Sequence, residues 1–121
     1  MSVGAITFVG GGNMGAALVE GLIRSGESPT GITIVETSAD RRKVLAEKFP
    51  GVTLSESIGQ CRAGVIAVKP GGAAEVCREL SAAGAERVLS IAAGVSVETL
   101  QAAASDSTAV LRAMPNTPAL V

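Results

Sequence analysis

The chain has 121 residues, of which 47% are hydrophobic and 17% are charged, and this is typical of one globular domain with a core of its own. Its 10 basic and 11 acidic residues leave a formal net charge of -1 at pH 7, so neither nucleic acid nor an anionic membrane surface is expected as a partner. The sequence contains no histidine, tyrosine or tryptophan, which excludes histidine-ligated metal sites, Ser-His-Asp triads and tyrosine acid catalysis, and no metal site is predicted.

Nothing in the sequence indicates a membrane span or export. No apolar run approaches the ~20 residues that cross a bilayer, and residues 1–4 lack the basic start of a signal peptide. Cys61 and Cys77 stand far apart and form no CxxC pair, so we expect both to be reduced and buried as small apolar side chains. The predicted location is the cytoplasm.

Short apolar runs rich in β-branched residues recur along the chain, and each has a length that suits a strand. All are predicted to be buried strands, and in chain order they cover residues 5–9, 32–35, 65–68, 88–91 and 109–111. Residues 52–54 are a further, shorter candidate.

Helical periods of apolar residues lie between these runs. They predict helices at residues 14–23, at 44–49 with Val44, Leu45 and Phe49 on the apolar face, at 75–80, and at 97–104 with Ser96 as the N-cap. Because strands alternate with helices, the expected fold is α/β: a doubly wound, mainly parallel sheet of Rossmann type with helices on both faces.

Residues 9–15 read VGGGNMG, directly after the first predicted strand and at the start of the first predicted helix. Gly10, Gly12 and Gly15 match G-x-G-x-x-G, the dinucleotide-binding pattern for this position. Gly10 permits a tight turn, Gly12 leaves room for a pyrophosphate near the backbone, and Gly15 lets the helix pack closely on the sheet. The helix N-terminus offers N–H groups and a partial positive charge to the phosphates. We therefore predict a nucleotide site, the alternative being glycines that serve only the turn.

Glu36 follows the second predicted strand, about twenty residues beyond the glycine pattern, where dinucleotide folds place the residue that meets the adenosine ribose. Its carboxylate can accept hydrogen bonds from a ribose 2′-hydroxyl, which favours NAD. Arg41 and Arg42 follow shortly after it and can instead hold the 2′-phosphate of NADP, unless they are solvated residues at the start of the second helix. The sequence is compatible with NAD and with NADP.

Two later stretches, residues 67–72 and 90–94, end the strands that follow. Ligands of open α/β sheets bind beyond the carboxyl ends of the strands, so both stretches are expected on the ligand side. Lys69 is a candidate for catalysis there, although a lysine that caps a strand end or pairs with a carboxylate is the simpler interpretation. Small residues at 92–94 leave room for a flat ring.

Four motifs together resemble pyrroline-5-carboxylate reductase: the glycine loop with Asn13-Met14, AVKPG at 67–71, SIAAGV at 90–95 and RAMPNTPALV at 112–121. The resemblance covers the whole chain in the same order. It implies an oxidoreductase of proline biosynthesis, in which a hydride passes from NADPH or NADH to the C=N bond of 1-pyrroline-5-carboxylate, a small-molecule imine, and produces L-proline.

The glycine pattern and the resemblance together predict a set of site residues. The cofactor-binding residues are Val9, Gly10, Gly11, Gly12, Asn13, Met14, Gly15, Glu36, Thr37, Ala67, Val68, Lys69, Pro70, Ile91, Ala92 and Ala93, and the substrate-side residues are Pro115 and Asn116. No catalytic residue is assigned.

The chain also departs from the family that it resembles. Many members carry an Asn-Arg pair after the second strand to hold a 2′-phosphate, where this chain has Glu36-Thr37. Members continue into a helical domain that dimerises and supplies much of the substrate pocket. Residues 1–121 are therefore expected to be the NAD(P)-binding domain of a homo-oligomeric protein and to be inactive alone. Two alternatives stay open: another NAD(P)-dependent imine or β-hydroxyacid-type dehydrogenase, and a nucleotide-binding module without catalysis.

Overall fold

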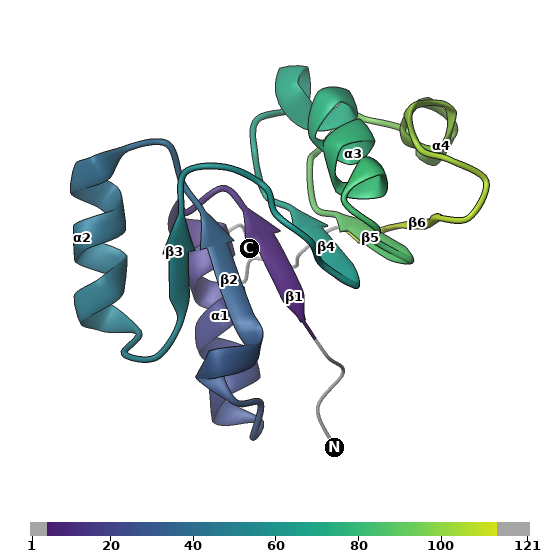
Figure 1. Cartoon of the computed structure of the whole chain (residues 1–121). Helices are drawn as coiled ribbons and strands as arrows, with labels where there is room; N and C mark the ends of the chain where they lie inside the picture. Colours follow the sequence, from purple (N-terminus) through teal and green to yellow (C-terminus); the bar gives the residue numbers. More distant parts are fainter. Residues whose placement is uncertain (1–4, 114–121) are drawn as a thin grey trace, which may run out of the picture.

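A computed structural model describes residues 5–113, in which strands and helices alternate except that two strands follow one another at residues 53–66 (Figure 1). In chain order the elements are β1 (Ile6–Val9), α1 (Asn13–Arg24), β2 (Ile32–Val35), α2 (Ala39–Lys48), β3 (Thr53–Ser55), β4 (Ala63–Ile66), α3 (Ala73–Ala82), β5 (Arg87–Ser90), α4 (Val97–Ala103) and β6 (Ala109–Arg112). Short 3-10 turns precede β2 and α3, at Pro29–Gly31 and Pro70–Gly72. Each predicted strand and helix is found, and the largest difference in bounds is at the second helix, which begins five residues before its predicted start at residue 44. None of the described helices is long and apolar enough to cross a membrane.

The strands form one six-stranded sheet in the order β3-β2-β1-β4-β5-β6, and every neighbouring pair is parallel. The chain starts in the middle, adds β2 and β3 on one side, and then crosses to β4 beside β1 to build the other side. This is the doubly wound Rossmann arrangement, so the predicted fold class is confirmed. The strand order reverses between β1 and β4, and open sheets of this kind bind their ligands at that point.

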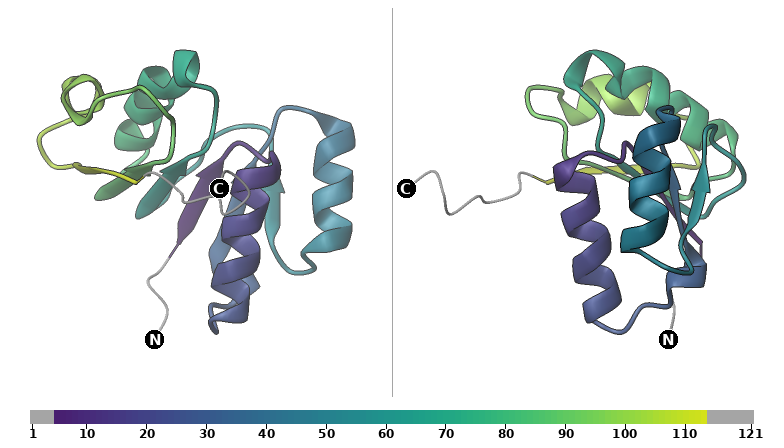
Figure 2. Two further views of the ribbon diagram at one scale, coloured as in Figure 1. Left: turned by 180° about the vertical axis from the view of Figure 1, so that it is seen from behind. Right: turned by 90° about the vertical axis from the view of Figure 1, so that its left-hand side faces the viewer.

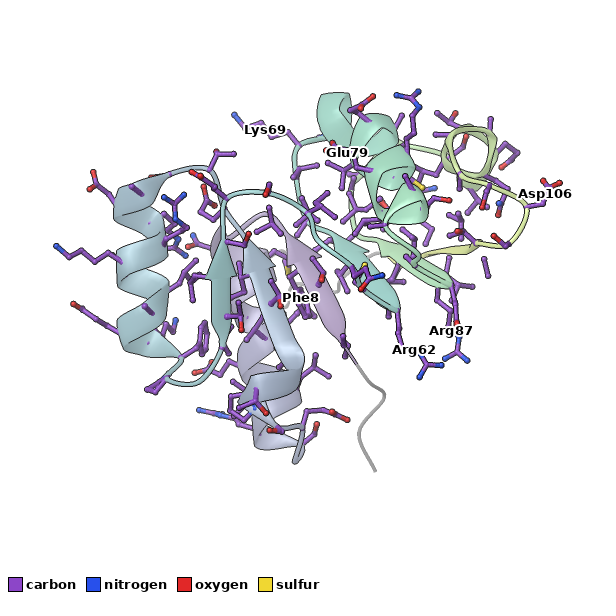
Figure 3. The ribbon with its side chains drawn as sticks, viewed as in Figure 1. Phe8, Arg62, Lys69, Glu79, Arg87 and Asp106 are labelled. Atoms are coloured by element: carbon purple, nitrogen blue, oxygen red, sulfur yellow. The ribbon has the colours of Figure 1, made fainter. Side chains whose placement is uncertain are left out.

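Alternating side chains of the strands build a separate core on each face of the sheet. On one face Ile6 and Phe8 pack with residues of α1 and α2, and Phe8 is almost fully buried in the middle of the sheet (Figure 3). On the other face Val9 and Ile66 pack with residues of α3 and α4. Figure 2 shows α1 and α3 on opposite sides of the sheet.

Among residues 5–113, no helix covers β4, β5 and β6 on the face that carries α1. Beside α1 lies a groove of about 490 Å³ over β4, β5 and β6, lined by apolar side chains that include Leu18, Val65 and Leu89. Leu111 of β6 borders this groove and is 56% exposed, and Ala109 is exposed as well. The prediction that 109–111 is a buried strand is therefore wrong for these two residues, and of the three only Val110 is buried. The reason is that β6 is an edge strand and none of the described helices covers it on this face.

Serine N-caps set the starts of α2 and α4. The Ser38 hydroxyl accepts a hydrogen bond from Arg41 N–H at 3.2 Å, and α2 therefore begins at Ala39, well before the predicted start at residue 44. The Ser96 hydroxyl accepts one from Thr99 N–H at 3.1 Å, as predicted for the start of α4.

Both cysteines are buried, as predicted. The Cys77 thiol donates to the carbonyl of Leu100 at 3.4 Å. Burial raises the pKa of both thiols above their ordinary value, and a hydrogen bond with Thr7 offsets part of the rise at Cys61. Both thiols therefore stay protonated near neutral pH and behave as small apolar side chains.

Leu45 and Val44 are neighbours on α2 that test how this helix packs. Leu45 is fully buried, whereas Val44 is 50% exposed although the apolar pattern predicts it on the core side. Leu45→Ala should lower the free energy of unfolding by about 2–5 kcal/mol because it leaves a cavity, whereas Val44→Ala should change it by less than about 0.5 kcal/mol. Chemical denaturation measures both values. Equal losses for the two variants would contradict the orientation of α2.

Candidate functional site

The predicted site lies where neighbouring strands end, at the carboxyl edge of the sheet. Gly10, Ala67 and Ile91 directly follow β1, β4 and β5, and hydrogen bonds continue the sheet ladder as far as these residues. Ala67 N–H donates to the carbonyl of Val9 at 2.9 Å, and Ile91 N–H donates to the carbonyl of Ile66 at 3.1 Å. The structure thus brings together the three stretches that were predicted separately, at the point where the strand order reverses.

Gly10 and Gly15 are required by close contacts of the backbone. Gly10 has a φ of +109°, and a Cβ at this position would lie 2.6 Å from the carbonyl oxygen of Ala67. A Cβ at Gly15 would lie 2.5 Å from the carbonyl oxygen of Gly10. Side chains at these positions would collide with backbone atoms, which confirms the predicted tight turn and the close packing of α1 at the sheet edge.

Gly12 stands instead in open space at the N-terminus of α1. A Cβ at this position would have no described atom within 4 Å, and its φ of -75° suits any residue. The first turn of α1 contains no acidic residue, and among the described residues no side chain caps it. The N–H groups and the partial positive charge of this helix end fit an anionic group. Open space, small residues and helix N–H groups together suit a pyrophosphate.

Gly11, in the glycine loop, is buried against α2 and Glu36. A Cβ at this position would lie 2.7 Å from Cδ1 of Leu45 and 2.9 Å from Oε1 of Glu36. The glycine pattern allows any residue here, and sequence reasoning assigned Gly11 to the cofactor without finding these contacts. The signal that could have indicated them is that the middle one of three consecutive glycines stands where the pattern does not need a glycine.

Glu36 and two arginines connect the glycine loop to the start of α2. The Glu36 carboxylate accepts hydrogen bonds from Gly11 N–H at 3.0 Å and from Ser38 N–H at 2.9 Å. Nε of Arg41 donates to the carbonyl of Gly11 at 2.6 Å, and Nη1 of Arg42 donates to the carbonyl of Glu36 at 2.7 Å. Neither arginine is simply a solvated residue of the helix, because each binds a backbone carbonyl of the site.

The chain beyond β4 carries the predicted residues of the AVKPG motif. Ala67 and Val68 are half-buried, whereas Lys69 and Pro70 are exposed. Lys69 extends away from the sheet (Figure 3) and forms no ion pair with any of the residues 5–113. The interpretation of Lys69 as a partner of a carboxylate therefore finds no support among the described residues.

The chain beyond β5 presents small side chains at the same edge. Ile91 is half-buried, Ala92 is buried and Ala93 is exposed, so the surface here consists largely of backbone and methyl groups. The predicted substrate-side residues, Pro115 and Asn116, lie outside the described residues.

Comparison with known proteins shows which family this chain belongs to. The family described as "NADP oxidoreductase coenzyme F420-dependent" matches residues 5–94, which include the glycine loop and the ends of β2, β4 and β5. The chain belongs to this family. Membership of an NADP oxidoreductase family agrees with the predicted nicotinamide cofactor.

Several relatives of this NADP oxidoreductase chain are pyrroline-5-carboxylate reductases. The protein of that name from Pasteurella multocida is 40% identical to it, over 100% of this chain and 47% of its own length. The one from Escherichia coli is 41% identical, over 96% of this chain and 45% of its own length. The predicted resemblance to this enzyme family is therefore confirmed along the chain, which spans less than half the length of these relatives.

Solved structures agree with the sequence comparison. A pyrroline-5-carboxylate reductase from Coxiella burnetii superposes with a TM-score of 0.84 at 35% identity, covering 95% of this chain and 45% of its own. The Plasmodium falciparum pyrroline carboxylate reductase with NADP bound superposes with a TM-score of 0.75 at 22% identity, covering 99% of this chain and 45% of its own, and thus shares the fold.

Alanine substitutions test the difference between Gly10, which the turn requires, and Gly12, which stands in open space. Gly10→Ala should lower the free energy of unfolding by at least about 1 kcal/mol, because alanine at a φ of +109° is strained and its Cβ meets the Ala67 carbonyl. Gly12→Ala should stay within about 0.5 kcal/mol of the unaltered chain. Denaturation curves measure both, and a Gly12→Ala variant as unstable as Gly10→Ala would contradict the loop geometry.

Proposed function

We propose that this chain forms the dinucleotide-binding domain of a pyrroline-5-carboxylate reductase, which reduces 1-pyrroline-5-carboxylate to L-proline. The observation that carries the proposal is the open Gly12 at the N-terminus of α1, at the point where the strand order reverses. Two relatives of that name are 40% and 41% identical to this chain in alignments that cover 100% and 96% of it. They support 1-pyrroline-5-carboxylate as the substrate over other imines or β-hydroxyacids.

The residues of the site divide by position along the sheet edge. Residues 9–15 hold the pyrophosphate, Glu36 and the exposed Thr37 lie at the ribose, and residues 67–70 and 91–93 line the nicotinamide half. When bound, the reduced nicotinamide supplies the hydride that the C=N carbon of the imine accepts. The contribution of this chain is to bind and orient the reactants, and none of its described residues is assigned as a proton donor.

The choice between NADP and NAD depends on three charged residues at the ribose end. Arg41 and Arg42 each bind a carbonyl through one N–H group, so their remaining guanidinium N–H groups can hold a 2′-phosphate, which supports NADP. Arg42 also lies 3.9 Å from the carboxylate of Glu56. The Glu36 carboxylate opposes a 2′-phosphate and supports NAD. NADP is the favoured cofactor and NAD is the alternative, and the reduced form is the one used.

The remaining assignments stay predictions. Pro115 and Asn116 are proposed to lie on the substrate side. The full-length protein is proposed to be a cytoplasmic homo-oligomer whose second, helical domain forms the dimer and completes the imine pocket.

Gly12→Val tests the pyrophosphate position. The valine side chain would occupy the open space at the N-terminus of α1 without meeting a described atom, so the fold should remain and the affinity for NADPH and NADH should fall by more than ~2 kcal/mol, about 30-fold. Isothermal titration calorimetry measures the affinity. Gly21→Val is the matched control, because Gly21 is also open but lies further along α1. Equal affinity of Gly12→Val and the unaltered chain would refute the assigned loop.

A second assay tests the division of labour between this chain and the rest of the protein. Residues 1–121 alone should bind NADPH but oxidise it with saturating 1-pyrroline-5-carboxylate at a negligible rate, because the imine is not held against the nicotinamide. The full-length Pasteurella multocida relative serves as the positive control, and absorbance of the reduced nicotinamide is the readout. Turnover by the 121 residues comparable to that of the relative would place all catalytic groups in this chain. Reduction of a different imine, but not this one, by the complete protein would overturn the proposed substrate.

A further inference from the structure

The backbone of Gly11 is held on both of its polar groups by charged side chains. Its N–H donates to Oε1 of Glu36 at 3.0 Å, and its carbonyl accepts from Nε of Arg41 at 2.6 Å. Glu36 follows β2 and lies 25 residues beyond Gly11 in the sequence, and Arg41 lies in the first turn of α2, 30 residues beyond Gly11. Bonds in which one partner is ionised are shorter and stronger than bonds between neutral groups.

The same two side chains are themselves held in place. The second carboxylate oxygen of Glu36 accepts from Ser38 N–H at 2.9 Å, and Ser38 caps the helix that carries Arg41. The Leu45 side chain of this helix lies close against Gly11, where a Cβ would not fit. Both oxygens of the carboxylate are thus engaged by backbone N–H groups, one in each of two loops.

We propose that Glu36 and Arg41 are positioning residues, here called the Gly11 clamp, which hold the glycine loop in its binding conformation before a nucleotide arrives. A loop that is already ordered loses less conformational entropy on binding, so the clamp raises the affinity for every ligand that carries a pyrophosphate. The proposal rests on the proposed function only in taking the glycine loop as the pyrophosphate site.

The clamp differs in its consequences from direct recognition of the ribose by Glu36. A carboxylate that accepts hydrogen bonds from the ribose hydroxyls distinguishes NADH from NADPH. Its removal therefore lowers the affinity for NADH and leaves the affinity for NADPH unchanged or higher. A clamp acts on the loop that both nucleotides share. Its removal therefore weakens the binding of all three ligands, NADPH as well as NADH and ADP, which lack the 2′-phosphate.

Five single variants of the chain test the clamp. Glu36→Gln and Arg41→Met remove the charges at nearly constant size, and Glu47→Gln and Lys43→Met are matched controls at exposed positions of α2. Calorimetric titration should show that Arg41→Met loses at least fivefold in affinity for NADH and ADP, which lack the 2′-phosphate that Arg41 is proposed to hold. Glu36→Gln should lose at least fivefold for NADH and ADP and should also lose affinity for NADPH, although it removes the carboxylate that opposes the 2′-phosphate. The controls should keep their affinity for all three ligands. Arg41→Lys should recover part of the loss, because an ammonium group can still donate to a carbonyl.

Amide hydrogen exchange adds a readout that a general loss of stability would not produce. In both clamp variants the amides of residues 11–14 should exchange at least fivefold faster, whereas those of α3, on the opposite face of the sheet, should not change. A fall in NADH affinity with unchanged or higher NADPH affinity would overturn the clamp in favour of ribose recognition. Unchanged affinities for all three ligands would also overturn it.

The outcome for the clamp can be separated from that for the proposed function. If the unaltered chain binds the nucleotides while the complete protein fails to reduce 1-pyrroline-5-carboxylate, only the proposed function is refuted, and the affinities of the variants still decide the clamp. If the unaltered chain binds none of the three ligands, the pyrophosphate site and the clamp are refuted together.

Discussion

The close approach of the turn after β1 to the end of β4 is the constraint on which the site depends. At Gly10 the backbone takes a φ of +109° and lies so near Ala67 that a Cβ would be 2.6 Å from its carbonyl oxygen. Gly15 meets Gly10 just as closely, so α1 begins directly at the edge of the sheet. Because side chains are excluded at both positions, the N-terminus of this helix lies where the strand order reverses.

A second consequence of this packing is that the two loops of the nucleotide half depend on each other. Gly11 has no side chain, so α2 can approach the glycine loop, and the charged groups of Glu36 and Arg41 reach its backbone. A residue that stands at the ribose end therefore also bears on the pyrophosphate loop. In this chain, a change at position 36 alters the charge that faces the ribose and the hydrogen bond that holds Gly11 at the same time.

The two faces of the sheet are covered to different extents. On the face of α3 and α4, Leu80 and Leu100 are fully buried. On the face of α1, the apolar groove leaves Leu111 of β6 exposed. Parallel strands are usually rich in apolar residues on both faces. In residues 5–113 this holds for β6 as well, although one of its faces is not covered. The apolar run at 109–111 therefore identifies a strand correctly but does not report on the burial of its individual residues.

Local patterns in the sequence were sufficient for the elements and for the glycine loop. β-Branched runs indicate the strands, helical periods indicate the helices, and G-x-G-x-x-G between a strand and a helix indicates the turn at Gly10, because each signal depends on residues that are neighbours along the chain. The alternation of strands and helices was likewise sufficient for the parallel, doubly wound fold, since short connections of one hand leave few other topologies.

The tertiary structure alone decided which residues meet across the chain. Val44 and Leu45 share one apolar pattern, yet only Leu45 is buried, because the angle at which α2 docks selects the buried side. Glu36 and Arg41 are identifiable as polar residues near a ribose, but their bonds to Gly11 join residues 25 and 30 positions apart. Such contacts arise from the packing of α2 on the glycine loop, and no periodicity or short motif encodes them, because periodicity and motifs describe only what is local.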